Sequence, residues 1–364
     1  MSQTLRVLEV VQSLEKGGRT TRFTDTVSGL RAAGHYVLPL CLSTPESWVN
    51  IPQLAVLEKS AGINWQLVFQ IRKLLKKHNI NLIHAHCEFS QLYAGLAGFT
   101  CGIKTVATFH RSDLSKYEPS KVNSLIKFLA SKYIAVSYDR LSLLTDNLNL
   151  PRENCHVVHG GANIEEIPTP ESIKQARETL SLDEDEIVLV SVGHLGEIKG
   201  HQDTISALSN LIEQAPNLHL YIAGDGSVKE KKKLETLIQD KHLGSNVTFL
   251  GQINNVTTWL EACDIFVQPS IEEAFGLVFV EAGAKAKPVV ATNVGGIKEI
   301  IIHDETGLLV PPASPDKLKT ALEQLISKPE DRARLGTNGY QRVLKEFSLP
   351  SMVKRYTEIF NKVI

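Results

Sequence analysis

The segment from Pro269 to Glu299 limits the fold more tightly than any other part of the chain. It reads PSIEEAFGLVFVEAGAKAKPVVATNVGGIKE, and seven residues separate its glutamates Glu273 and Glu281. The spacing of its apolar residues predicts a helix that follows Gly276 and carries Glu281, and then a buried strand over 289–292. A helix set between parallel strands is the repeating unit of a doubly wound α/β sheet.

The same segment carries groups suited to phosphate and to hydroxyls. Gly276 lets the backbone come close to a ligand, and the amides from Gly276 to Val278 are the free donors of a helix N-terminus, a common phosphate site. A carboxylate repels phosphate but accepts hydrogen bonds from neutral hydroxyls such as a ribose diol. We therefore expect the amides to bind phosphate and the glutamates to bind hydroxyls. The alternative is that both glutamates are solvated charges around an ordinary helix.

Strands and helices alternate along the rest of the chain. Apolar and β-branched runs predict parallel strands at 5–12, 35–40, 80–86, 104–110, 133–137, 186–192, 218–223, 247–250 and 265–267. Amphipathic spacing predicts helices at 20–33, 65–77, 90–99, 120–132, 201–214, 315–325, 330–346 and 348–364. Prolines and a glycine pair near residue 165 mark a boundary. We predict an N-terminal domain over 1–168, a C-terminal domain over 169–347 and a separate terminal helix over 348–364.

Charge and cysteine content narrow the class of protein. The net charge is −1, but residues 1–168 carry 18 Lys and Arg against 13 Asp and Glu, so the first half is basic and the second acidic. Five scattered cysteines without a CxxC motif fit reduced thiols and argue against a zinc ribbon. The sequence has no apolar run long enough to span a membrane, and it begins like a strand rather than a signal peptide. These features favour a cytoplasmic protein.

Four motifs resemble those of the retaining glycosyltransferases of family 4. The first is the pair Glu273 and Glu281 around a Phe-Gly turn. The others are the Gly17–Gly18 pair after the first strand, the run Thr108-Phe109-His110, and residues 193–200, which are similar to the family's GRLxxxKG motif. The resemblance implies the GT-B fold, with two Rossmann-like domains facing a central cleft and the terminal helix packed back on the N-terminal domain. It also implies transfer of a sugar from a UDP- or GDP-linked donor to an acceptor hydroxyl, with the anomeric configuration retained.

The resemblance assigns roles to individual residues. It implies that His110, Glu273 and Lys199 act at the reacting centre. Lys199 and the amides from Gly276 to Val278 would bind the diphosphate. It implies that Glu273 binds the sugar and Glu281 the ribose. The remaining donor-site positions are Gly17, Gly18, His194, Gly224, Phe249, Ile253, Phe275, Gly276, Leu277 and Val278. His194 replaces the family's arginine, so we expect weaker diphosphate binding at that position, since a neutral imidazole lacks arginine's forked donors.

We expect neither a metal ion nor another cofactor. His84 and His86 lie on one face of a strand, but no third ligand follows at a metal-like spacing. We interpret Asp183-Glu184-Asp185 as a solvated turn rather than a metal site. Nucleic-acid binding has no support beyond the modest excess of basic residues in the first half. The partners we expect are a nucleotide-sugar donor and a glycan or glycolipid acceptor, in cell-surface glycan or lipopolysaccharide synthesis. The basic helices 65–77 and 120–132 are either solvated faces or a docking surface for an anionic membrane.

Two alternatives to glycosyl transfer stay open on the sequence. One is a nucleotide-sugar 2-epimerase of the same fold, which needs no acceptor. The other is a nucleotide-sugar-binding protein with weak or no turnover, because His194 stands where the family has arginine.

Overall fold

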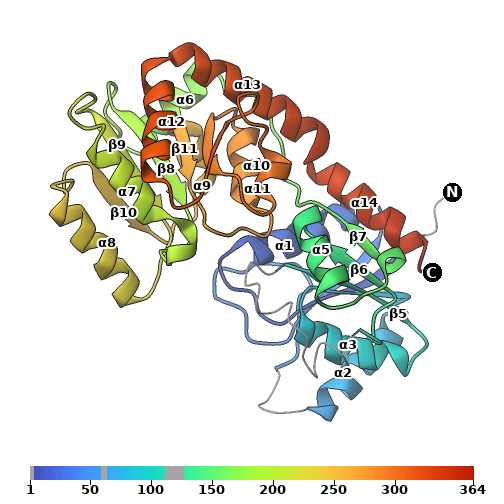
Figure 1. Ribbon diagram of the computed structural model, residues 1–364. Coiled ribbons are helices and arrows are strands. Elements are labelled where there is room, and N and C mark those ends of the chain that lie inside the picture. The colour runs from blue at the N-terminus through green and yellow to red at the C-terminus, as the bar shows by residue number, and fades with distance from the viewer. Residues whose placement is uncertain (1–3, 59–63, 111–126) are drawn as a thin grey trace. The chain divides into compact units, whose positions relative to one another are not determined.

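The computed structural model describes residues 4–58, 64–110 and 127–364, which form two compact units (Figure 1). Unit 1 comprises Met1–Gly161 and Leu349–Ile364, and unit 2 comprises Ala162–Ser348. The boundaries predicted from the sequence are residues 168 and 347. Each unit contains one parallel sheet with helices, which confirms the predicted α/β class.

Unit 1 is built on a seven-stranded sheet in the order β3-β2-β1-β4-β5-β6-β7, with every neighbouring pair parallel. Its strands are β1 Arg6–Val11, β2 Tyr36–Cys41, β3 Ala55–Val56, β4 Leu82–Ala85, β5 Lys104–Phe109, β6 Lys132–Ala135 and β7 Cys155–Val157. Its described helices are α1 Gly18–Ala32, α2 Trp65–Lys77, α3 Glu88–Phe99, α5 Tyr138–Asp146, the 3₁₀ turn η2 Arg152–Asn154 and α14 Leu349–Asn361.

Helix α14 belongs to unit 1 although it ends the chain. Its buried Met352, Val353, Tyr356, Ile359 and Phe360 share one apolar core with α1 and β1. The two helices approach so closely that a Cβ at Gly29 of α1 would lie 2.4 Å from the Val353 side chain. The glycine in α1 is therefore required by packing rather than by backbone conformation.

Unit 2 is built on a six-stranded sheet in the order β10-β9-β8-β11-β12-β13, again with every neighbouring pair parallel. Its strands are β8 Ile187–Val192, β9 Leu218–Ala223, β10 Val247–Gly251, β11 Ile265–Gln268, β12 Val289–Thr292 and β13 Leu308–Val310. Its helices are α6 Pro170–Thr179, η3 Glu197–Lys199, α7 His201–Ser209, α8 Val228–Asp240, α9 Val256–Ala262, α10 Leu277–Ala284, α11 Ile297–Ile300, α12 Pro315–Ser327 and α13 Pro329–Glu346.

The two sheets share one strand order. In each sheet the first strand of the unit lies between two groups of later strands. The strand order therefore changes direction between β1 and β4 in unit 1 and between β8 and β11 in unit 2. In open parallel sheets, ligands bind at the carboxyl ends of the strands that flank such a switch point. The loops after β1, β4, β8 and β11 are therefore where each unit is expected to bind its ligand.

The predicted elements differ from the structure in three ways. Short elements were missed: β3, β7, β13, α5, α6 and α11. Pro170, interpreted as linker, opens α6, where Thr169 and Ser172 form a reciprocal cap. The predicted helix 120–132 lies mostly outside the described residues, and its described end is wrong, because 127–129 form a turn and Lys132 begins β6 beside β5. Within the described residues no helix is both long and apolar enough to cross a bilayer.

Two glycines of α13 give a matched test of packing in unit 2. A Cβ at Gly336 would lie 2.0 Å from the carbonyl oxygen of Ala286, whereas a Cβ at Gly339 would lie 3.4 Å from the nearest atom, the carbonyl oxygen of Thr306. Gly336→Ala is therefore expected to lower stability by about 1–3 kcal/mol, roughly 2–4 °C in Tm for each kcal/mol. Gly339→Ala is expected to leave Tm unchanged or raise it, because alanine favours a helix interior. Equal shifts in calorimetry would contradict this account.

Candidate functional site

A lysine and a glutamate predicted separately from the sequence lie in contact in unit 2. Lys199 ends the short helix η3 after β8, and Glu273 lies in the loop between β11 and α10. The Lys199 Nζ is 2.5 Å from Glu273 Oε2, with the side chains 23% and 9% exposed. Such a partly buried pair holds an ammonium and a carboxylate in fixed places, where a ligand with both phosphates and hydroxyls can meet each of them.

Gln268 holds this pair in position. Its Nε2 donates to the carbonyl oxygen of Lys199 at 2.6 Å, and its Oε1 accepts from the Val192 amide at 3.1 Å and from Ser191 Oγ at 3.0 Å. This buried side chain therefore connects the ends of β8 and β11 to the loop that carries Lys199. Sequence reasoning missed Gln268, although a polar residue that ends the apolar strand IFVQ is a signal for such a role.

Three glycines bring the loops around the pair into backbone contact. A Cβ at Gly200 would lie 2.0 Å from the Pro269 carbonyl oxygen, one at Gly224 would lie 1.9 Å from that of Gly193, and one at Gly295 would lie 1.8 Å from that of Glu273. Their φ angles of +70°, +142° and +49° also favour glycine. No side chain fits at these positions, so the glycines fix where the loops lie.

Helix α10 begins beside Glu273. Its N-cap residue is Gly276, with φ +93°, and no side chain caps its first turn. Phe275 is buried and packs against Phe347, while Leu277 and Val278 are half-buried. The first turn of α10 therefore presents the amides predicted to bind phosphate.

Glu281 of α10 is in a different situation from Glu273. It has no hydrogen-bond or ion-pair partner within the described residues, and burial raises its pKa above the ordinary value of a glutamate. A carboxyl group that loses water without gaining a partner destabilises the folded chain. Such a group is typical of a site that a ligand completes.

The other predicted donor positions of unit 2 lie in neighbouring loops. His194 is exposed; its Nδ1 accepts from the Gly196 amide at 3.0 Å, and its Nε2 is 3.9 Å from Glu230 Oε2. The neighbouring His201 is buried, which lowers its pKa to about 4, and its ring lies 3.2 Å from the His194 carbonyl oxygen. Phe249 packs partly against the core of unit 2, and Ile253 is half-buried in the loop after β10.

The predicted residues of unit 1 lie at the carboxyl ends of β1 and β5. Gly17, with φ +146°, is the N-cap residue of α1, and Gly18 is the first residue of that helix. His110 directly follows β5, and its Nε2 lies 3.0 Å from His86 Nδ1, with the two rings stacked. Burial, with the positive field of Arg22 and other neighbours, holds the pKa of His110 well below its ordinary value, so its ring is neutral near pH 7.

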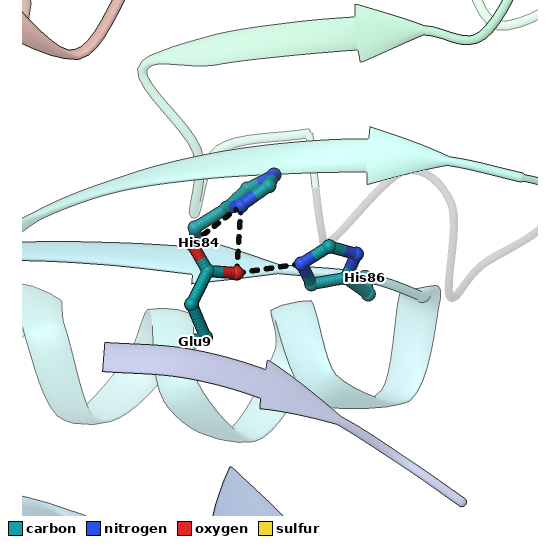
Figure 2. A group of neighbouring side chains, drawn as sticks. All are labelled: Glu9, His84 and His86. Atoms are coloured by element: carbon teal, nitrogen blue, oxygen red, sulfur yellow. Dashed lines mark hydrogen bonds and ion pairs between the residues drawn. The ribbon is translucent and has the colours of Figure 1, made fainter. Parts of the chain in front are cut away.

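Behind His110 lies a buried cluster that sequence reasoning only partly anticipated. Figure 2 shows the Glu9 carboxylate between the rings of His84 and His86, with Glu9 Oε2 2.8 Å from His84 Nδ1 and 2.6 Å from His86 Nε2. All three residues are fully buried, and their ligand atoms lie within 4.8 Å of one another, as in some metal sites. The expected absence of a third group was therefore wrong. Glu9 was missed because it comes from β1, but an acidic residue inside the apolar run LRVLEVVQ was a visible signal.

Comparison with known proteins identifies the family of each half of the chain. Residues 16–166 match the family model "Glycosyltransferase Family 4", and residues 172–342 match "Glycosyl transferases group 1". The chain is 27% identical over 305 residues to the N-acetyl-alpha-D-glucosaminyl L-malate synthase of Bacillus anthracis, covering 82% of this chain and 79% of that protein.

Solved structures show the same fold. Anabaena Alr3699/HepE in complex with UDP superposes with a TM-score of 0.87 at 22% identity, over 98% of this chain and 100% of that one. WaaG, a glycosyltransferase involved in lipopolysaccharide biosynthesis, superposes with a TM-score of 0.76 at 18% identity, over 97% and 99%. With its two parallel-sheet units and both family models matched, the chain belongs to glycosyltransferase family 4 and has the GT-B fold.

Proposed function

We propose that the chain transfers a sugar from a nucleotide diphosphate sugar to an acceptor hydroxyl, with retention of the anomeric configuration and without a metal ion. The contact between Lys199 and Glu273 carries this proposal. It lies at the switch point of unit 2, where a nucleotide is expected in this class of sheet. The uncapped first turn of α10 and the unpaired Glu281 supply the remaining groups that such a donor needs.

The groups divide between the parts of the donor. Lys199 and the amides from Gly276 to Val278 bind the diphosphate, because an ammonium and a helix N-terminus both favour negative charge. Glu273, with the backbone of Phe275 and Gly276, accepts from the sugar hydroxyls. Glu281 accepts from the ribose diol, and the nucleobase lies near Phe249 and Ile253. For His110 of unit 1 we propose a hydrogen bond to the substrate.

Catalysis in this proposal is mostly positioning and charge stabilisation. The departing diphosphate gains negative charge in the transition state, and Lys199 with the dipole of α10 stabilises that charge in place of a metal ion. Glu273 takes no nucleophilic role, because its carboxylate already contacts Lys199 and binds hydroxyls. The leaving phosphate itself accepts the proton of the acceptor hydroxyl on the same face of the sugar, which accounts for retention.

For the donor we propose a UDP- or GDP-linked sugar, with UDP favoured because Alr3699/HepE, of the same fold, was solved with UDP and with UDP-glucose. For the acceptor we propose a glycan or glycolipid of cell-surface or lipopolysaccharide synthesis, supported by the likeness in fold to WaaG. A 2-epimerase would instead need no acceptor, and adding one would release no free nucleotide. A binding protein with weak turnover would bind the donor tightly and release nothing under any acceptor.

A thermal-shift panel identifies the donor before any acceptor is known. UDP-glucose, UDP-N-acetylglucosamine and GDP-mannose are added to the full chain, and the true donor is expected to raise Tm, since a ligand that binds only the folded state stabilises it by about 2.7 kcal/mol at 100 times Kd. Glu281→Ala is expected to lose most of this shift. A panel in which no nucleotide sugar changes the Tm of the wild-type chain would overturn the proposed donor class.

Removal of either Lys199 or His110 is expected to abolish most turnover. Lys199→Ala and His110→Ala should each lower kcat by about 100-fold or more, a typical loss for an electrostatic group at the reacting centre. The matched control is Lys233→Ala, because Lys233 also lies 2.5 Å from a glutamate, Glu197, but both side chains are exposed. Nucleotide release in the presence of acceptor measures turnover. A Lys199→Ala enzyme as active as the Lys233→Ala enzyme would remove Lys199 from the site.

We also propose that α2 docks on an anionic membrane. Trp65 and Phe69 are 67% and 53% exposed, and they lie on the outer face of the helix with Arg72, Lys73 and Lys76, at spacings of three or four residues. The opposite face of α2 packs in the core of unit 1 through Leu67, Ile71 and Leu75. Aromatic residues beside cations are typical of helices that lie in a membrane interface. The second predicted basic helix, 120–132, lies mostly outside the described residues.

Vesicle sedimentation tests this surface. The chain is expected to bind vesicles of anionic phosphatidylglycerol, not of phosphatidylcholine, and to be released as salt rises, since screening shortens the range of the attraction. The double variant Lys73→Glu with Lys76→Glu should lose binding. Lys229→Glu with Lys232→Glu, the same charge change on the exposed face of α8, should not. If both double variants lost vesicle binding equally, binding would depend on net charge and not on α2.

A further inference from the structure

A continuous run of hydrogen bonds leads from the interior of unit 1 to His110. Glu9 Oε2 lies 2.6 Å from His86 Nε2, and His86 Nδ1 lies 3.0 Å from His110 Nε2. On the other side of Glu9, His84 Nδ1 contacts the carboxylate at 2.8 Å, and His84 Nε2 lies 2.7 Å from Thr108 Oγ1. The remaining ring nitrogen of His110, Nδ1, has no hydrogen-bond partner within the described residues. Whether Nδ1 carries a hydrogen therefore depends on whether Nε2 carries one.

Each contact in this run joins one donor to one acceptor, so the position of one proton fixes the others. If Glu9 is a carboxylate, it only accepts, and His86 must donate from Nε2. A neutral His86 then has a bare Nδ1, which accepts from His110. His110 carries its hydrogen on Nε2, and its Nδ1 is left as an acceptor.

The opposite state of Glu9 reverses the result. If Glu9 is a carboxylic acid that donates to His86 Nε2, the hydrogen of His86 moves to Nδ1 and is donated to His110 Nε2. His110 then carries its hydrogen on Nδ1 and becomes a donor. A single buried proton on Glu9 therefore decides whether His110 offers a lone pair or an N–H to a ligand.

The surroundings favour the carboxylate. Desolvation is the main cause that lowers the pKa of His84 and His86, and the positive field of Arg22, which is buried beside the cluster, lowers it further. Its guanidinium donates to Tyr356 OH at 2.9 Å and to the carbonyl oxygen of Val158, both of them neutral. Glu9 is the only carboxylate among the buried described residues of unit 1, so it is the one group there that can balance this charge. Desolvation raises the pKa of Glu9 overall, and the hydrogen bond with His86 offsets only part of that shift, so the carboxylate depends on the buried positive charge of Arg22.

A metal ion would account for the same three residues less well. Each of the ring nitrogens of His84 and His86 already has a hydrogen-bond partner, and the Glu9 carboxylate lies directly between the two rings. A divalent cation beside the buried guanidinium of Arg22 would add like charge where little water screens it. The hydrogen-bond run explains every contact without that cost.

We propose that Glu9 and His86 are positioning residues that hold His110 in the tautomer with hydrogen on Nε2, so that His110 Nδ1 accepts a hydrogen bond from a hydroxyl of the substrate. The proposal rests on the proposed function only for the hydroxyl-bearing ligand, because the tautomer is a property of the chain alone.

The tautomer is measured directly in the full chain without substrate. In a long-range ¹H–¹⁵N spectrum of protein labelled at histidine, with the signals of His110 assigned by their loss in His110→Ala, Nε2 is expected to carry hydrogen and Nδ1 to be bare. A hydrogen on Nδ1 would overturn the proposal. So would one equivalent of tightly bound metal in elemental analysis of chain purified without chelator. Neither result depends on whether transfer is detected.

Variants of His86 separate positioning from packing. His86→Phe removes the acceptor for His110, so His110 should show both tautomers and kcat should fall about 10- to 100-fold, as for other partners that orient a histidine. His86→Asn keeps an oxygen that can accept from His110 Nε2, and it should restore the single tautomer and much of the rate. The control Thr105→Val removes a buried hydroxyl of β5 that lies outside this run and should change neither. A loss in His86→Asn as large as in His86→Phe would count against positioning.

Discussion

The contact between Lys199 and Glu273 is the constraint on which the rest of unit 2 depends. Partly buried ion pairs contribute little to stability, because both charges lose water when they meet. The surrounding chain nevertheless holds this pair firmly, through Gln268 and through glycines at Gly200 and Gly295 that allow backbone contact. Ligand positioning explains why Gln268 and these glycines hold a pair that adds little stability. In the proposed function, a diphosphate binds the Lys199 ammonium and leaves the Glu273 carboxylate for hydroxyls.

The two units solve the same physical problem at their switch points. In unit 1 the central strands β1 and β4 carry Glu9 and His84, and His86 directly follows β4; in unit 2 the central strands β8 and β11 carry Ser191 and Gln268. These side chains are fully buried, and they hydrogen-bond across adjacent strands instead of packing as apolar residues. Buried polar groups of this kind are costly unless fully paired, and once paired they fix the geometry around them. Each unit therefore has a rigid polar core directly below the loops that carry its candidate site residues.

The sequence predicted what depends on local pattern. The strands and most helices follow from apolar periodicity, and α2 was predicted with its observed bounds, because its apolar spacing and basic end are clear. The spacing of Glu273 and Glu281 identified the loop and helix of unit 2, since both lie within one short segment. The sequence could not show that Lys199 touches Glu273, because seventy-four positions separate them and only the sheet brings them together. Glu9 and Gln268 were not predicted as site residues for the same reason, because each has hydrogen-bond partners on another strand. Short elements such as β7 carry too few residues for a period to appear.

The contrast between Glu273 and Glu281 explains how two carboxylates can serve a donor that carries two phosphates. Glu273 has a cation at 2.5 Å, so its charge is balanced before any ligand arrives. Glu281 has no partner within the described residues, and burial raises its pKa, so its charge is the less stable of the two. A nearby diphosphate raises the pKa of a carboxyl group further, because like charges disfavour ionisation. The proposed function therefore assigns the carboxylate that contacts Lys199 to the sugar, and the carboxyl group that has no partner within the described residues to the ribose.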